Sequence, residues 1–279
     1  MQPEEYRRTS YEAWGSVAPG WDRWQARIEE STAPVQDWIV RELAPQPGDT
    51  VLELAAGPGG TGFAAAACIG ASGRLIMTDF SPDMIEIARR RGSKLGLRNV
   101  AYRVMDAERI ELDSASVDGV LCRFGYMLMA DPAAALAETR RVLRPGGRLA
   151  LAVWGPPERN PWIAIGARLL VENGRMPPPE PGAPGPFSMA SEERTQALLQ
   201  GAGFTQTRLE DVPVRFAYRD LDDFIDFGAD TGGPFAAAIR SMSQDEREAM
   251  KQQLTRAFAG FASAAGYEFP GAALCAVAS

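Results

Sequence analysis

The chain has 279 residues, 46% of them hydrophobic and 23% charged, with a formal net charge of −7 and no histidine. Such a composition is typical of a globular enzyme with one large domain, or one domain carrying a sizeable insertion. The negative charge argues against a nucleic-acid partner, and the missing histidines exclude histidine acid–base catalysis, serine–histidine and cysteine–histidine nucleophiles, and histidine-ligated metals.

The cysteine pattern and the length of the apolar runs indicate in which cellular compartment the protein is located. Cys68, Cys122 and Cys275 are odd in number and far apart, so they form neither a disulfide framework nor a zinc-binding spacing. The acidic start MQPEEYRR is unlike a signal peptide, and no apolar run reaches the length of a membrane span. We expect a cytoplasmic protein without a bound metal.

The first 48 residues predict two helices. Aromatic and small residues recur at helical spacing up to Trp21, although Pro19-Gly20 is expected to interrupt a continuous helix. Ser31-Thr32 is expected to cap the second helix, which ends before Pro45.

Strands then alternate with helices. Apolar runs predict strands at 50–55, 74–79, 99–106, 117–124 and 148–154. Helices are expected at 61–69, from Pro82 with Ser81 as its cap, and from Pro132 up to Pro145-Gly146-Gly147. Alternation of this kind predicts an α/β fold with a parallel, doubly wound sheet and right-handed crossovers.

The pattern changes after residue 154. The segment 176–186 is dense in proline and is expected to form a surface loop, and a strand over 204–218 is expected to break at Pro213. The remaining segments predict helices at 161–173, 191–201, 220–229, 234–241 and 243–262, and a closing strand at 271–278.

A glycine-rich turn follows the first strand. Residues 51–62 read VLELAAGPGGTG, with Gly57 and Gly59 in the turn, and the next strand ends in Asp79. In open α/β sheets such glycines let the backbone approach a nucleoside, and the acid accepts hydrogen bonds from ribose hydroxyls. A nucleoside cofactor at the carboxyl edge of the sheet is therefore predicted.

The sequence is compatible with two nucleoside cofactors at this site. The literal G-x-G-x-x-G spacing of the turn is compatible with a nicotinamide dinucleotide. S-adenosylmethionine (SAM) is favoured because Glu53 suits a cationic amine, and because the turn holds no lysine or arginine for a pyrophosphate. The third strand also ends in an acid and a small residue, Asp106-Ala107, which suit the edge of an adenine ring.

Over about residues 10–155 the chain resembles the class I SAM-dependent methyltransferases. It is most similar to the branch with the quinone-biosynthesis C-methyltransferases and many small-molecule methyltransferases. Residues 53–59, ELAAGPG, match the acidic glycine-rich first motif, and residues 138–151, ETRRVLRPGGRLAL, match the family's segment before the fifth strand. Ala55 stands where many members have glycine, and its methyl group is expected to require a negative φ.

The resemblance implies a role for several side chains. Asp79 would bind the ribose, Phe80 and Met84 would flank the adenine, and Asp106-Ala107 would contact its edge. Trp21 would cover the cofactor and Arg123 would lie beneath it. The implied cofactor-binding set is Trp21, Glu53, Ala55, Gly57, Gly59, Asp79, Phe80, Met84, Asp106, Ala107 and Arg123.

The same resemblance implies a Rossmann-like, mostly parallel seven-stranded sheet with N-terminal helices and a helical cap. We expect an N-terminal helical lid at 1–48 and a SAM-binding core at 49–155. A cap with a strand return to the core is expected at 156–240, and a C-terminal helix and final strand at 241–279.

The expected function is methyl transfer from SAM to a small, hydrophobic or aromatic metabolite, with carbon, oxygen and nitrogen acceptors all left open. Aromatic residues of the cap indicate an apolar pocket, and Arg123 and Tyr126 are candidates for the residues near the substrate; no single catalytic residue is predicted. The alternatives are a SAM-retaining cyclase, an NAD(P)-dependent oxidoreductase and a cofactor-free interaction module. The number of chains is left open, with a homodimer among the options.

Overall fold

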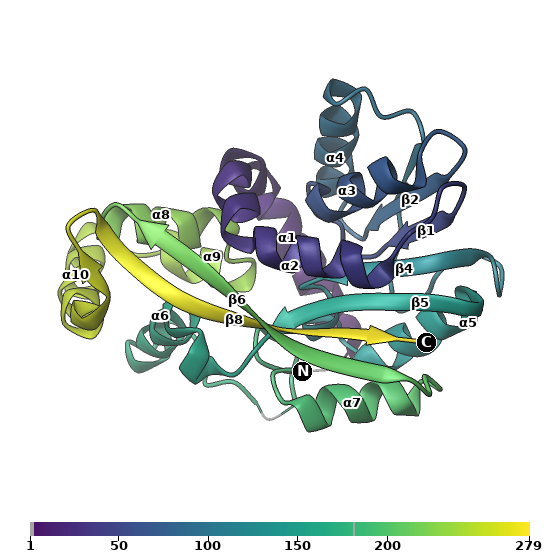
Figure 1. Ribbon diagram of the computed structural model, residues 1–279. Coiled ribbons are helices and arrows are strands. Elements are labelled where there is room, and N and C mark those ends of the chain that lie inside the picture. Colours follow the sequence, from purple (N-terminus) through teal and green to yellow (C-terminus); the bar gives the residue numbers. More distant parts are fainter. Residues whose placement is uncertain (1–2, 181) are drawn as a thin grey trace.

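The computed structural model describes residues 3–180 and 182–279, so Met1, Gln2 and Pro181 of the predicted lid and loop lie outside the described residues. One twisted sheet runs through the molecule in the order β3-β2-β1-β4-β5-β8-β6, and the two-residue β7 pairs with β8 (Figure 1). Its strands are β1 (Thr50–Glu53), β2 (Arg74–Asp79), β3 (Val100–Val104), β4 (Val117–Arg123), β5 (Leu143–Trp154), β6 (Thr207–Tyr218), β7 (Ala262–Ser263) and β8 (Gly266–Ala278).

The first five strands are parallel and the last pairings are antiparallel. β1 pairs in parallel with both β2 and β4, whereas β8 runs antiparallel to β5 and β6. This confirms the predicted α/β class and the mostly parallel sheet of seven strands, with β7 added. Because the chain order reverses between β1 and β4, the carboxyl ends of these strands form the switch point where ligands bind in such sheets.

Helices cover both faces of the sheet. α2 and α3 pack against each other on one face and α5 and α7 pack together on the other, while α6, α8 and α10 surround the outer half of the β6–β8 ribbon (Figure 1). The helices are α1 (Pro3–Arg23), α2 (Gln25–Leu43), α3 (Gly60–Ile69), α4 (Pro82–Lys94), α5 (Pro132–Val142), α6 (Pro161–Glu172), α7 (Glu192–Gly201), α8 (Leu221–Thr231), α9 (Pro234–Arg240) and α10 (Gln244–Ala257).

Local signals account for many of these boundaries. The central strands read as apolar runs because both faces of a parallel sheet are buried, and β1, β2 and β4 are almost entirely buried. Ser81 caps α4 as predicted, since its side chain accepts from the N–H of Met84. Ser243 and Glu246 form a capping box at the start of α10.

The predicted interruption of the first helix is wrong. α1 continues through Pro19-Gly20 to Arg23 and is separated from α2 only at Trp24. Tertiary contact explains this, because a Cβ on Gly20 would lie 2.0 Å from the carbonyl oxygen of Asp230. The bare glycine thus lets α1 pack closely against α8, and this packing outweighs the local proline penalty.

The predicted cap of the second helix is also wrong. α2 begins at Gln25, and the hydroxyl of Thr32 lies within the helix, donating to the carbonyl oxygen of Ile28 at 2.6 Å. The break predicted at Pro213 does not occur, because β6 is the edge strand and Pro213 pairs there with Ala272. An edge strand tolerates proline because its outward side needs no N–H donor.

Several segments differ in length from their prediction. α5 ends at Val142, and Pro145-Gly146-Gly147 belongs to β5. α10 ends at Ala257, short of the predicted 262, and β8 begins at Gly266 instead of 271. The two long strands β6 and β8 pair over their whole lengths and carry the sheet beyond its parallel part. Within the described part of the chain no helix has the length and apolarity of a membrane span.

Candidate functional site

The carboxyl ends of β1, β2 and β4 meet at the switch point of the sheet. The parallel register places Glu53 beside Met77 of β2 and Leu121 of β4. The turn after β1 is tied to β2, since the N–H of Ala56 donates to the carbonyl oxygen of Thr78 at 2.9 Å. The glycine-rich turn therefore sits directly over the centre of the sheet edge.

The turn bends through left-handed backbone. Gly57 and Gly59 have φ of 53° and 89°, which glycine adopts at little cost. Ala55 has φ of 49°, so the expectation that its methyl group requires a negative φ is wrong. A left-handed alanine costs about 1–2 kcal/mol, which the surrounding contacts of the turn must offset.

Glu53 is a buried carboxylate with one of its two oxygens unpartnered. The N–H of Gly62 donates to its Oε1 at 2.9 Å, whereas its Oε2 is buried without a partner. Burial raises the pKa of Glu53 to about 8, against the opposing effects of the Gly62 N–H and of the Arg123 charge. An unpartnered carboxylate oxygen of this kind calls for a cation or a donor.

Asp79 ties the turn to the end of β2. Its Oδ2 accepts from the N–H of Gly57 at 2.8 Å and its Oδ1 from the N–H of Ser81 at 2.9 Å. Burial raises the pKa of Asp79 to about 6, although these N–H donors favour the charged form. A carboxylate has about four acceptor sites, so Asp79 keeps capacity for two further donors such as ribose hydroxyls.

The other predicted cofactor residues lie on the same edge but differ in exposure. The N–H of Met105 donates to the carbonyl oxygen of Asp79 at 2.9 Å, which brings Asp106 and Ala107 next to the end of β2. Asp106 is exposed and Ala107 is buried. Asp106 accepts the N–H of Glu108 at 2.9 Å.

The two predicted adenine neighbours face α1. Phe80 is half-buried and meets the ring of Tyr11 edge-on, with centroids 6.0 Å apart. Met84 is buried in a small apolar cluster with Val17 and Ala18. Their side chains thus contact the N-terminal helix, which passes across the sheet edge.

Arg123 and Tyr126 follow β4 but have different surroundings. Arg123 is half-buried and donates to Thr32 of α2. Tyr126 is fully buried, with its hydroxyl 2.6 Å from that of Thr139 in α5, and burial raises its pKa well above the usual range. A fully buried, hydrogen-bonded tyrosine is a packing element, so the structure gives no support to Tyr126 as a residue near the substrate.

A small cavity of about 10 Å³ brings two of the predicted residues together. It contains Trp21 and Arg123, and the Nε1 of Trp21 donates to the carbonyl oxygen of Thr231 in α8 at 3.1 Å. A volume of this size holds about one water molecule. The full lining is Trp21, Gln25, Ile28, Glu29, Pro58, Gly60, Arg91 and Arg123. We call this space the crevice.

Sequence reasoning missed two charged residues of the crevice. Arg91 of α4 donates to the carbonyl oxygen of Pro58 at 2.6 Å and to Glu29 of α2, also at 2.6 Å. Both lie in ordinary helical segments, where charged residues usually indicate a solvated face. The ion pair joins α2 to α4, and Arg91 also joins α4 to the turn, so tertiary packing brings both residues to the site.

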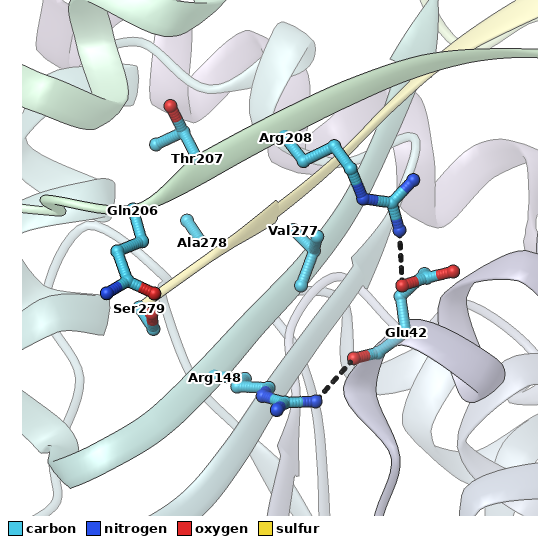
Figure 2. A pocket seen from close by; sticks show the side chains of 8 residues that line it. All are labelled: Glu42, Arg148, Gln206, Thr207, Arg208, Val277, Ala278 and Ser279. Atoms are coloured by element: carbon cyan, nitrogen blue, oxygen red, sulfur yellow. Dashed lines mark hydrogen bonds and ion pairs between the residues drawn. The ribbon is translucent and has the colours of Figure 1, made fainter.

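A second cavity lies elsewhere. It measures about 310 Å³ and is formed where β6 begins and β8 ends, beside Arg148 of β5 (Figure 2). Arg208 pairs there with Glu42, and Arg148 donates to the Glu42 carbonyl oxygen at 3.4 Å (Figure 2). None of the predicted site residues lines it. Among residues 3–180 and 182–279 no cluster of three or more acidic or cysteine side chains could hold a metal ion.

The chemistry at the carboxyl ends of β1 and β2 fits SAM. The unpartnered oxygen of Glu53 suits the cofactor's ammonium group, and the remaining acceptor sites of Asp79 suit ribose hydroxyls. No basic side chain belongs to the turn itself, since Arg91 and Arg123 come from α4 and β4. The donor set therefore favours a cationic nucleoside over a pyrophosphate.

Comparison with known proteins gives the family. A family described as a methyltransferase domain matches residues 51–147. The chain is 40% identical to a demethylmenaquinone methyltransferase of Deinococcus radiodurans over 83 residues, which cover 30% of this chain and about a third (34%) of that relative. It is 32% identical over 150 residues to the aklanonic acid methyltransferase DauC of a Streptomyces species, covering 54% of this chain and 67% of DauC.

A solved structure supports the fold. The crystal structure of the cyclase SpnF superposes with a TM-score of 0.53 and 18% identity, covering 88% of this chain and 79% of SpnF. At this identity the likeness concerns the fold alone. Because the domain match and the identity to DauC over two thirds of that protein agree with the fold and with the order of motifs at the sheet edge, the chain belongs to the class I SAM-dependent methyltransferases, whose cofactor is S-adenosylmethionine.

Proposed function

We propose that this protein transfers the methyl group of SAM to a small, hydrophobic or aromatic metabolite. The observation that carries the proposal is Glu53, whose buried Oε2 lacks a partner beside the glycine-rich turn. DauC and the Deinococcus relative are named as methyltransferases of aklanonic acid and demethylmenaquinone, both small molecules, which supports the substrate class.

Binding and positioning are the main duties of the residues at this edge. SAM, when bound, supplies an activated methyl group on a positively charged sulfur. We assign the amine of the cofactor to Glu53 and its ribose to Asp79. We assign its adenine to Phe80 and Asp106-Ala107. Trp21 would cover the bound cofactor. Methyl transfer is an in-line displacement, so holding the acceptor close to the methyl group and excluding water supply most of the acceleration.

The N-terminal helices suit the proposed role of a lid. α1 is fastened near its start by Tyr6, which donates to the carbonyl oxygen of Leu128 at 2.9 Å. Near its end it is fastened by Trp21 and by Arg23, which pairs with Asp230 at 3.1 Å. Since the crevice holds only about 10 Å³, cofactor entry requires that α1 and the Glu29–Arg91 pair move outward. The predicted cap over 156–240 would then close over the acceptor.

Titration calorimetry with SAM and with S-adenosylhomocysteine tests the proposed function. We expect binding of both ligands in the micromolar range, and mass spectrometry of reactions with small phenols and quinols should show products that gain one methyl group. Absence of binding by either ligand would overturn the proposal. A protein-dependent fluorescence change with NADH and none with SAM would favour the oxidoreductase instead.

A cyclisation on the same fold is a second candidate. Two observations favour it: the chain has no histidine to act as a base, and Tyr126 is engaged in the core. Conversion of a substrate without gain of a methyl group, in the presence of SAM, would identify this activity.

Replacing Asp79 by alanine should weaken SAM binding by about 1–2 kcal/mol, a factor of about 5 to 30, because the ribose loses a charged hydrogen-bond partner. Calorimetry measures this directly. The control is Asp113→Ala in the exposed loop before β4, for which we expect unchanged affinity. Equal SAM affinity of wild type and Asp79→Ala would place the ribose elsewhere.

The expected location and partners stay predictions. Free thiols at Cys68, Cys122 and Cys275 support the cytoplasm, and the net charge of −7 supports a protein that does not bind nucleic acid. A homodimer stays one of the open options.

A further inference from the structure

Phe124 has an unusual backbone at a position where the fold places ligands. It follows β4 directly and has φ of 62°, a left-handed conformation that bulky residues rarely adopt. Its N–H still donates to the carbonyl oxygen of Ala152 at 2.7 Å, so the residue is held by the sheet. A Cβ on the next residue, Gly125, would lie 2.6 Å from the methyl group of Ala55. The left-handed bend therefore lies against the cofactor turn.

The Phe124 ring packs against a set of aromatic side chains, Trp154, Trp162 and Phe216, which we call the aromatic wall. The ring stacks on Trp154, at the end of β5, with centroids 3.9 Å apart and planes inclined by 16°. Trp154 is buried and is backed edge-on by Trp162 and Phe216, whereas Phe124 is only half-buried. One face of Phe124 is thus occupied by a rigid support.

A cation lies near the Phe124 ring. The Arg123 guanidinium carbon is 5.9 Å from the Phe124 centroid, while Trp154 is stacked on one face of that ring. A planar ring stacked between two groups needs roughly 3.5 Å on each side, about 7 Å in total. The 5.9 Å between the guanidinium carbon and the ring centroid is about 1 Å short of this spacing, so the Arg123 head group must move away from Phe124 to admit a ring. Arg123 also lines the crevice.

We infer that Phe124 and Arg123 form a clamp for a planar, electron-rich aromatic ring of the methyl acceptor. The inference rests on the proposed function and narrows its substrate class. Stacking on Phe124 selects a flat ring, and the guanidinium above it favours a π face rich in electrons. A saturated ring of the same size offers neither interaction. Strained backbone persists at ligand-binding positions where a side chain must be held in one orientation. The left-handed backbone of Phe124 fits such a ligand-binding role.

The test compares 2-naphthol with its saturated analogue decahydro-2-naphthol by calorimetry, in the presence of saturating S-adenosylhomocysteine. Wild type should bind 2-naphthol at least tenfold more tightly. Phe124→Gly and Phe124→Asn both suit a left-handed backbone, and both should lose this preference to within about twofold while their affinity for S-adenosylhomocysteine is unchanged. Their melting temperatures should stay within about 4 °C of wild type, because relief of backbone strain offsets the lost stacking.

Phe261→Leu serves as the matched control. Phe261 is also half-buried and contacts one ring, Phe269, at 4.7 Å, but it belongs to the far end of the β8 ribbon. It should keep the tenfold preference. Equal affinity of wild type for the two alcohols, or a preserved preference in both Phe124 variants, would overturn the clamp. If wild type fails to bind S-adenosylhomocysteine, the proposed function fails instead, so the two failures are distinguishable.

Discussion

Glu53→Gln is expected to stabilise the free protein by about 3–5 kcal/mol at pH 8, and by less than about 1 kcal/mol near pH 4. Burial raises the pKa of Glu53 from 4.5 to about 8 in the folded chain. The folded state therefore binds one more proton than the unfolded state between these values. Wild type loses about 1.4 kcal/mol of stability per pH unit as the pH rises through this window, and glutamine, which carries no charge, does not.

Urea unfolding of both proteins at pH 4, 6 and 8 measures this difference. Asp79, whose pKa is raised to about 6, lowers the stability of both proteins alike between about pH 4 and 6, so its effect cancels in the comparison. Glu86→Gln, on the exposed side of α4, is the control and should change stability by less than about 0.5 kcal/mol at every pH. A difference between Glu53→Gln and wild type that does not grow with pH would show that Glu53 does not titrate in this window.

The same substitution should weaken cofactor binding. If Glu53 holds the ammonium group of SAM, the neutral amide removes a charged hydrogen bond and affinity falls by about 2 kcal/mol. Stability and affinity would then change in opposite directions. This is the pattern expected for a carboxylate that is costly to bury and is kept for its ligand.

Gly62→Ala is expected to destabilise the protein by about 3 kcal/mol, although alanine is the better helix former. A Cβ on Gly62 would lie 1.9 Å from Oε2 of Glu53 and 3.0 Å from Cε of Met77. The Glu53 side chain is buried, and to make room for the Cβ it must move away from Gly62 and give up its bond from the Gly62 N–H. Overpacking and a broken buried hydrogen bond add in the same direction.

Thermal and urea unfolding measure the loss, with Gly201→Ala as the matched control. Gly201 ends α7, where a Cβ meets nothing within 4 Å, so this substitution should be neutral or stabilise by about 0.5 kcal/mol. In a Glu53→Ala background the cost of Gly62→Ala should fall below about 1 kcal/mol, because the clashing group is gone. Full additivity of the two substitutions would contradict the contact.

The sheet and its cofactor edge were readable from local pattern. Strands buried on both faces must be continuous apolar runs, and a turn that approaches a nucleoside needs glycines, so β1, β2 and the turn with Gly57 and Gly59 left clear signals. The acids Glu53 and Asp79 stood out for a related reason, because a carboxylate at the end of an apolar run needs a ligand or a partner.

Features that depend on contacts between distant segments were not readable. Pro19-Gly20 signals a break, yet α1 stays continuous because Gly20 packs against the backbone of Asp230. Tyr126 follows a strand end like a ligand residue, yet its hydroxyl meets Thr139 in the core.

Alternation and turn composition thus dictated the α/β sheet, the position of its nucleoside edge and the acids upon it, because those patterns are local. The left-handed backbone of Ala55 and Phe124, the Glu29–Arg91 pair and the aromatic wall behind Phe124 were decided by tertiary packing. Each of these joins residues from separate elements, and the free energy that holds them arises only when those elements pack together.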